Sequence, residues 1–186
     1  MDINRFGRIT TADTMLLLID IQEKFVPHIF EIDRVIRNSV IVSKGCRISG
    51  IPIVITEQYP EGLGRTVPDL AEACGECRPF EKTAFSAFED TAIFNEIKRI
   101  DRPNILLAGI EAHVCLIKTA LDAIDLGYSI HWLVDCISSR TAANAETAFT
   151  RAVQCGAFAS SAEMALFQLM ESSSDANFRS ISKLVK

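Results

Sequence analysis

The sequence predicts a three-layer α/β/α domain with a mainly parallel, Rossmann-like central sheet. Continuous apolar runs lie at 15–19, 51–55 and 105–108. Such runs indicate strands that are buried on both faces, as in parallel sheets, whereas half-exposed strands show alternating patterns. Segments with helical periodicity separate the runs, and this alternation is typical of repeated βαβ units. A sheet with a majority of antiparallel strands would contradict the prediction.

The first half of the chain supplies two strands and two helices. The first apolar run ends in a carboxylate and predicts a strand at 15–20. Apolar residues at helical spacing predict a helix over 32–48, which a glycine ends before the second strand at 51–56. Proline and glycines mark 59–64 as a loop. A further helix is expected over 88–100, where isoleucine and phenylalanine share one face.

The second half repeats the alternation. A proline ends the preceding helix, and the apolar run that follows predicts a third strand at 104–109. A helical pattern over 115–126 is closed by a glycine, a fourth strand follows at 128–134, and a helix at 142–155 again stops at a glycine. A short strand at 157–159, a helix near 162–170 and a polar, loose tail from Ser172 complete a single domain over 1–186, with its core at about 14–170.

Composition excludes several classes of protein. A chain of 186 residues suits one domain, and 48% hydrophobic residues with a net charge of −5 can bury a core, which excludes intrinsic disorder. The 19 basic residues against 24 acidic ones disfavour binding to nucleic acid. No apolar run approaches the roughly 20 residues of a membrane span, and the first residues lack an apolar signal core, so we expect a soluble cytoplasmic protein.

The six cysteines are expected to be mostly free, buried thiols. A secreted disulfide scaffold would be shorter and poorer in aliphatic residues. Cys74-Gly-Glu-Cys77 has the spacing of a redox pair or of half a zinc site, but no second such pair or histidine pair completes a metal site. A thiol-redox role for these two residues therefore stays a minor alternative.

Chemistry is expected where the strands end, because ligands of parallel sheets bind beyond the carboxyl ends of the strands. The third strand leads into Gly109-Ile-Glu-Ala-His-Val-Cys115 at the start of a helix. A helix start favours a thiolate and offers unpaired N–H groups that could bind an oxyanion. Cys115 is therefore a candidate nucleophile, and the alternative is a buried core cysteine.

Two other residues could complete such a site. Asp20, at the end of the first strand, is either a general base or a residue that caps a loop. Lys82 stands in the aromatic segment 80–88, which could remove it from water. His113 is too close to Cys115 in the chain for an ordinary base–nucleophile pair, so a Cys–His hydrolase is poorly supported. Spacing alone does not show that the candidates meet.

Three motifs together resemble the isochorismatase-like cysteine hydrolases, a superfamily that includes nicotinamidases and N-carbamoylsarcosine amidases. They are Asp20-Ile-Gln-Glu-Lys-Phe25, Glu81-Lys-Thr-Ala-Phe-Ser-Ala-Phe88 and Gly109-Ile-Glu-Ala-His-Val-Cys115, and the resemblance covers about 15–163. The segment 56–69 further resembles the branch called isochorismatase domain-containing proteins.

The resemblance implies a catalytic triad of Asp20, Lys82 and Cys115, with the cysteine as nucleophile, the aspartate as proton shuttle and the lysine favouring the thiolate. It also implies a cis peptide bond between Ile110 and Glu111, so that the Glu111 and Cys115 N–H groups form an oxyanion hole. The expected substrate contacts are Phe25, Gln58, Tyr59, Phe85, Ile110, Ala112 and His113.

One departure from the family limits the activity. Nicotinamidases bind a metal through an aspartate and histidines after the second strand, whereas this loop reads Thr56-Glu-Gln-Tyr59 without a histidine. We therefore expect no metal and no cofactor. Members that cleave isochorismate can lack the cysteine, so its presence here favours amide, carbamoyl or ester cleavage.

The leading hypothesis is a hydrolase that cleaves a small C–N bond through a thioester on Cys115. Its partners would be a small-molecule substrate and further copies of the chain, as a dimer or tetramer, because eleven phenylalanines and 48% apolar residues are many for a lone domain. The alternatives are an isochorismate-type vinyl-ether hydrolase and a non-catalytic, oligomeric binding protein on the same scaffold.

Overall fold

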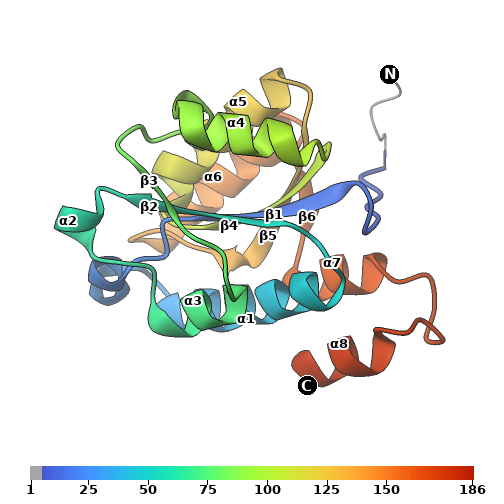
Figure 1. The fold of residues 1–186 in the computed structure, drawn as a ribbon. Helices are drawn as coiled ribbons and strands as arrows, with labels where there is room; N and C mark the ends of the chain where they lie inside the picture. Colours follow the sequence, from blue (N-terminus) through green and yellow to red (C-terminus); the bar gives the residue numbers. More distant parts are fainter. Residues whose placement is uncertain (1–5) are drawn as a thin grey trace.

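A six-stranded, fully parallel sheet forms the centre of the computed structural model, which describes residues 6–186 (Figure 1). The strand order is β3-β2-β1-β4-β5-β6, so β1 and β4 lie in the middle. Helices cover both faces, which confirms the predicted three-layer fold. The strands are β1 (Thr14–Ile19), β2 (Ile53–Gln58), β3 (Phe80–Lys82), β4 (Asn104–Gly109), β5 (Ser129–Ile137) and β6 (Phe158–Ser160).

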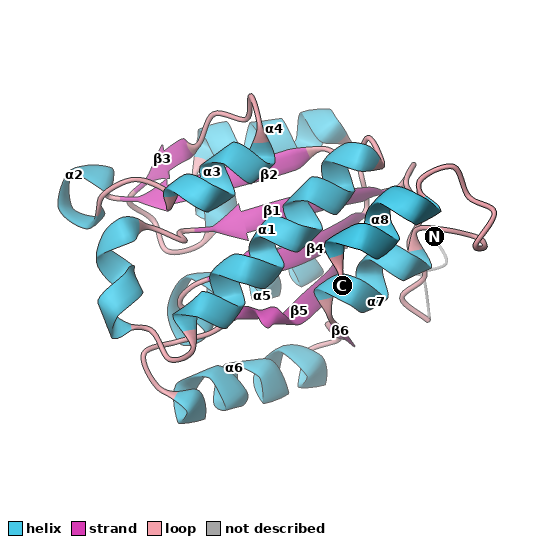
Figure 2. Cartoon of the chain, turned by 90° about the horizontal axis from the view of Figure 1, so that it is seen from below, coloured by secondary structure: helices cyan, strands magenta, loops and turns pink. Residues whose placement is uncertain are grey.

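Each face of the sheet has its own set of helices. One face carries α1 (Ile32–Ile48), α3 (Pro68–Cys74), α7 (Ala162–Gln168) and α8 (Phe178–Leu184), as Figure 2 shows. The other carries α4 (Thr91–Ile100), α5 (Ile117–Asp125) and α6 (Ala142–Gln154). Shorter helical turns are η1 (Glu23–His28), α2 (Pro60–Leu63), η2 (Ala87–Glu89) and the π-helical turn η3 (Ala112–Leu116).

The alternation of side chains along β1 divides the core into two clusters. Leu16 and Leu18 pack with α1, whereas Met15, Leu17 and Ile19 pack on the opposite face. Every residue of β1 and of β4 is buried. The unbroken apolar runs are therefore explained by helices on both sides of the central strands.

The register brings several strand ends to one edge. Ile19 pairs with Thr56 of β2 and with Gly109 of β4, while Gln58 pairs with Lys82 of β3. Gly109 has φ +137°, and a Cβ built there would lie 2.1 Å from the Ile19 carbonyl oxygen, so only glycine fits this close approach. The chain continues from this edge directly into η3.

Some elements differ from the prediction. The strand β3 and the helices α2 and α3 were not predicted, and α2 lies in the segment expected to be a loop. The expected helix over 88–100 is divided, because the Asp90 side chain accepts hydrogen bonds from the N–H groups of Ala92 and Ile93 and starts α4 there.

The prediction of a loose C-terminal tail is wrong. Residues Phe178–Leu184 form α8, whose Ile181 is fully buried against the α1 side of the core and is joined there by Val185. The spacing of four residues puts these two side chains on one helical face. Over the described residues, no helix combines the length and the apolar character needed to span a bilayer.

Candidate active site

Asp20 follows β1 directly and is almost completely buried. Its backbone has φ +55°, a left-handed conformation that aspartate tolerates better than most residues. The side chain uses both carboxylate oxygens: Oδ1 accepts from Thr56 Oγ1 at 2.7 Å, and Oδ2 accepts from Lys82 Nζ at 2.7 Å. A buried carboxylate is thus paired with a cation and held in one orientation.

Lys82 ends β3 and lies within the protein, with 0% of its side chain exposed. Its ammonium donates to Asp20 Oδ2 and to Gln58 Oε1, both at 2.7 Å. The carbonyl oxygens of Ala84 and Phe85, each 3.3 Å from Nζ, compete for the third N–H group of the ammonium. The cost of burying an ammonium is therefore offset by one charge and three polar acceptors.

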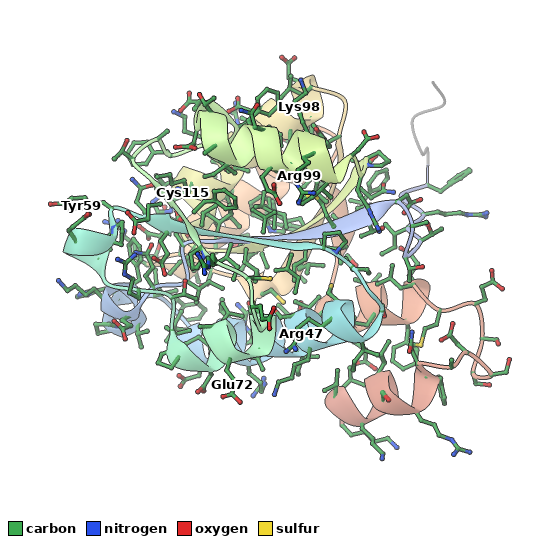
Figure 3. All side chains as sticks on the ribbon, viewed as in Figure 1. Arg47, Tyr59, Glu72, Lys98, Arg99 and Cys115 are labelled. Carbon is green, nitrogen blue, oxygen red and sulfur yellow. The ribbon has the colours of Figure 1, made fainter. Side chains whose placement is uncertain are left out.

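Cys115 lies in η3, only 6% exposed, and its thiol is close enough to the Asp20 and Lys82 side chains for both to shift its pKa. Figure 3 labels this residue on the face of the sheet that α4, α5 and α6 cover. Burial and, after it, the Asp20 carboxylate raise the pKa of the thiol to about 12, although Lys82 opposes both effects. The direction of this shift favours the protonated form of the resting thiol. Desolvation outweighs the one nearby cation.

The strand β2 holds this group from one side. The Gln58 N–H donates to Gln22 Oε1 at 2.8 Å, and Gln22 Nε2 donates back to the Gln58 carbonyl at 3.0 Å. The Gln58 Nε2 donates to the Thr83 carbonyl at 2.8 Å, so the side chain is committed to Lys82 and β3. The substrate contact predicted for Gln58 stays a prediction. Sequence analysis missed the role of Thr56. Its place near the carboxyl end of a buried strand was the available signal, because chemistry was expected at that edge of the sheet.

The turn after β4 carries the second set of predicted residues. The Ile110–Glu111 peptide bond is cis. Glu111 Oε1 accepts from Arg140 Nη2 at 2.6 Å, and Oε2 accepts from the Arg140 N–H at 2.9 Å. The arginine holds the pKa of this carboxyl below its usual range. The side chains of Ile110 and Ala112 are fully buried in opposite core clusters, so the substrate contacts predicted for them would be made by their backbone.

The remaining predicted contact residues differ in burial and in their neighbours. His113 is turned toward α6, where Nδ1 is 3.0 Å from Ser139 Oγ and Nε2 is 3.4 Å from Asn144 Nδ2. Tyr59 and Phe85 are 55% and 49% exposed, and the N–H of Tyr59 donates to the Lys82 carbonyl. Phe25 is half-buried and packs against the α1 side of the core.

The cysteine pair Cys74 and Cys77 raised the alternatives of a metal site and a redox pair. Residues 6–186 contain no group of three or more histidine, cysteine, aspartate or glutamate side chains arranged to hold a metal ion. Cys74 and Cys77 are free thiols, and burial raises the pKa of Cys74 to about 11 and that of Cys77 above its usual value. A cavity of about 230 Å³ borders Lys82 and Tyr59.

Comparison with known proteins shows the same domain throughout. The sequence profile of the isochorismatase domain matches residues 14–164. Isochorismatase domain-containing protein 2 of Danio rerio is 39% identical, over 96% of this chain and 90% of its own length. A structure described as the MAR1 ribonuclease from Caenorhabditis elegans superposes with a TM-score of 0.91 at 35% identity, covering 96% of this chain and 92% of that one. The YcaC gene product of Escherichia coli, described as an octameric hydrolase of unknown specificity, gives 0.89 at 19% identity, covering 96% and 91%.

Proposed function

Given that the chain belongs to the isochorismatase family, we propose that it is a hydrolase that cleaves a C–N bond of a small amide or carbamoyl compound through a thioester on Cys115. One observation carries this proposal: a buried thiol lies in reach of a carboxylate that is itself paired with a buried lysine. A protein that used this scaffold only for binding would have no use for an ammonium and a thiol removed from water together.

The resting protonation states define the first step. Because burial and the Asp20 carboxylate disfavour the Cys115 thiolate, Asp20 accepts the thiol proton while the sulfur attacks the substrate carbonyl. The tetrahedral intermediate then carries a negative oxygen. We assign the Glu111 and Cys115 N–H groups as its hydrogen-bond donors, since both belong to the turn after β4, and each such donor is worth about 3 kcal/mol.

Asp20 also serves the second half of the reaction. The carboxylic acid formed in the first step gives its proton to the leaving amine, and the C–N bond breaks. Water then attacks the thioester, with Asp20 accepting a proton and returning it to the sulfur. Lys82 stays an ammonium and compensates the carboxylate whenever it is charged, while Thr56 fixes its orientation.

The proposal includes the assembly and location expected from the sequence. We expect a cytoplasmic homo-oligomer, a dimer or tetramer, that acts on a small molecule without a metal ion. The octameric description of the Escherichia coli neighbour supports self-association as a property of related chains. Exposed apolar side chains support it independently, and they include Val134, Val153, Met164 and Phe167.

Two competing activities remain for comparison. A vinyl-ether hydrolase of the isochorismate type would not need Cys115. RNA cleavage is suggested by the description of the Caenorhabditis elegans neighbour. A phosphodiester offers no acyl carbon to a thiol, and a chain of net charge −5 attracts no polyanion, so the site favours amide cleavage.

The test is a substrate panel read with matched variants. Small amides, carbamoyl compounds, esters, a vinyl ether and RNA are incubated with the wild type, Cys115→Ala, Asp20→Asn and, as control, Cys155→Ala, whose thiol is exposed. Ammonia release should vanish in Cys115→Ala, fall by about 10²–10⁴ in Asp20→Asn and persist in Cys155→Ala. Vinyl-ether hydrolysis that survives Cys115→Ala, or turnover of RNA alone, would contradict the proposal.

A further inference from the structure

Gln58 stands out because every polar group of the residue is committed. Its backbone N–H and carbonyl bind the two ends of the fully buried Gln22 amide, at 2.8 and 3.0 Å. Its Nε2 donates to the Thr83 carbonyl at 2.8 Å, which leaves Oε1 as the atom that faces Lys82. Backbone and side-chain contacts thus fix both the position and the orientation of this amide.

The amide in turn limits what the lysine can do. An ammonium has three N–H groups. Asp20 and Gln58 each accept one at 2.7 Å, and the two carbonyls that compete for the third are both more distant, at 3.3 Å. Without Gln58, the ammonium could turn toward these carbonyls and away from Asp20. The position of the Lys82 ammonium relative to Asp20 therefore depends on a neutral acceptor of fixed orientation, the Gln58 side chain.

We infer that Gln58 is a positioning residue: its side-chain carbonyl holds the Lys82 ammonium against Asp20 and so sets how readily Asp20 exchanges a proton with Cys115. The effect on catalysis rests on the proposed function. The hydrogen bonds between Gln58 and Lys82, from which the inference is argued, are independent of it. Gln58 acts through Lys82 and has no direct role on the substrate.

The charges around this group are few, which makes a change at Gln58 measurable. Lys82 from β3, Asp20 from the end of β1 and Cys115 from η3 face one another. The nearby acids are turned elsewhere: Glu57 and Glu81 pair with Arg65, and Glu111 pairs with Arg140. A carboxylate placed at position 58 would therefore be a second anion on Lys82, where the structure now has one.

The experiment compares Gln58→Glu with Thr83→Glu. Both add one negative charge beside Lys82, but the side chain of Thr83 is exposed, where water and salt screen it. In Gln58→Glu the ammonium is shared by two carboxylates, so Asp20 binds a proton more readily. The acid limb of the kcat/KM profile should move to higher pH by about 1 unit, and in Thr83→Glu by less than about 0.2.

Gln58→Ala provides a second, independent variant. It removes the acceptor without adding charge, so Lys82 is held less firmly against Asp20: kcat should fall about tenfold, and the acid limb should move to higher pH by less than it does in Gln58→Glu. Identical profiles for Gln58→Glu and Thr83→Glu, or unchanged kcat in Gln58→Ala, would overturn the inference.

A readout without substrate separates this inference from the proposed function. Alkylation of Cys115 by iodoacetamide, followed by peptide mass spectrometry at pH 8, should be about tenfold slower in Gln58→Glu than in Thr83→Glu, because Lys82 supports the thiolate less. If the wild type hydrolyses nothing, the proposed function fails while this difference still decides the role of Gln58. Equal alkylation rates would overturn the inference whatever the wild type hydrolyses.

Discussion

At the scale of single residues, the site depends on how buried charges compensate one another. The ion pair between Lys82 and Asp20 is almost completely removed from water, at 0% and 1% side-chain exposure. Such a pair contributes little net stability when complete, because desolvation opposes the attraction, but removing one partner leaves an uncompensated charge. The same compensation bears on the nearby Cys115 thiol, whose pKa is raised by burial and by Asp20, since a third buried charge would leave one counter-ion for two anions.

The first prediction concerns this ion pair. Lys82→Met should lower the free energy of unfolding by about 3–5 kcal/mol, because Asp20 is left buried without its cation. The double variant Lys82→Met/Asp20→Asn should recover part of that loss. Urea unfolding of the single and double variants measures both. Equal stability of Lys82→Met and the wild type would show that the lysine is not buried against Asp20.

The second prediction concerns His131, a residue outside the site. Its ring is 2% exposed, stacks on Phe158, and leaves Nε2 without a hydrogen-bond partner among the described residues. Burial lowers the pKa of this histidine to about 4, and the more distant Asp13 opposes the shift only weakly. The unfolded chain binds the proton near pH 6.5, so the unfolded state gains protons first as pH falls.

Stability should therefore decline between about pH 6.5 and pH 4, by up to about 3 kcal/mol from this residue. His131→Phe removes the titrating group and should flatten that part of the curve, while His28→Gln, at an exposed position, should leave it unchanged. Urea unfolding at half-unit pH steps provides the curves. A curve for His131→Phe as steep as that of the wild type would rule out this histidine as the cause.

At the scale of elements, the sequence predicts the central strands because they have the continuous apolar runs that are typical of buried parallel strands. The runs that became β1, β2 and β4 are long and apolar, and the helices between them have clear periodicity. By contrast, β3 has only three residues and one buried side chain, so neither its length nor its pattern separates it from a loop. Lys82 was therefore found through its aromatic neighbours and the family resemblance, and not through a predicted strand.

The candidate site, too, could be predicted from the sequence only in part. A strand end made Asp20 a candidate and a predicted helix start after a strand made Cys115 one, since the carboxyl ends of parallel strands meet at one edge. The role of Gln58 depends on the orientation of a side-chain amide, and the protonation of Cys115 depends on its burial. Neither quantity can be read from residue type and spacing.

The helix α8 gives the third prediction. Three of its seven residues are apolar, Phe178, Ile181 and Leu184, but the helix follows a mostly polar stretch at 172–177, which is why the sequence suggested a loose tail. Because Ile181 is fully buried, Ile181→Ala should cost about 2–4 kcal/mol of unfolding free energy, whereas Ser180→Ala, at an exposed position of the same helix, should change it by less than about 0.5. Chemical denaturation measures the unfolding free energy of both variants. If Ile181→Ala lost no stability, the C-terminal segment would be loose, as the sequence suggested.

At the scale of the whole molecule, the fold leaves apolar surface near the β6 edge of the sheet. A groove of about 610 Å³ runs between β5, β6, α6 and α7, and Trp132, Phe149 and Met164 contribute to its lining. The fourth prediction is the proposed self-association: light scattering at micromolar concentration should give a mass of two or four chains. A mass of one chain across that range would refute it.

The central claim, that Cys115 becomes acylated during turnover, is tested most directly by trapping the intermediate. The wild type is quenched with acid during turnover of its best ester or amide substrate and digested for peptide mass spectrometry. We predict that the peptide containing Cys115 carries the acyl mass, that hydroxylamine removes it, and that Cys115→Ala has neither adduct nor turnover. Turnover at the wild-type rate in Cys115→Ala would contradict the claim.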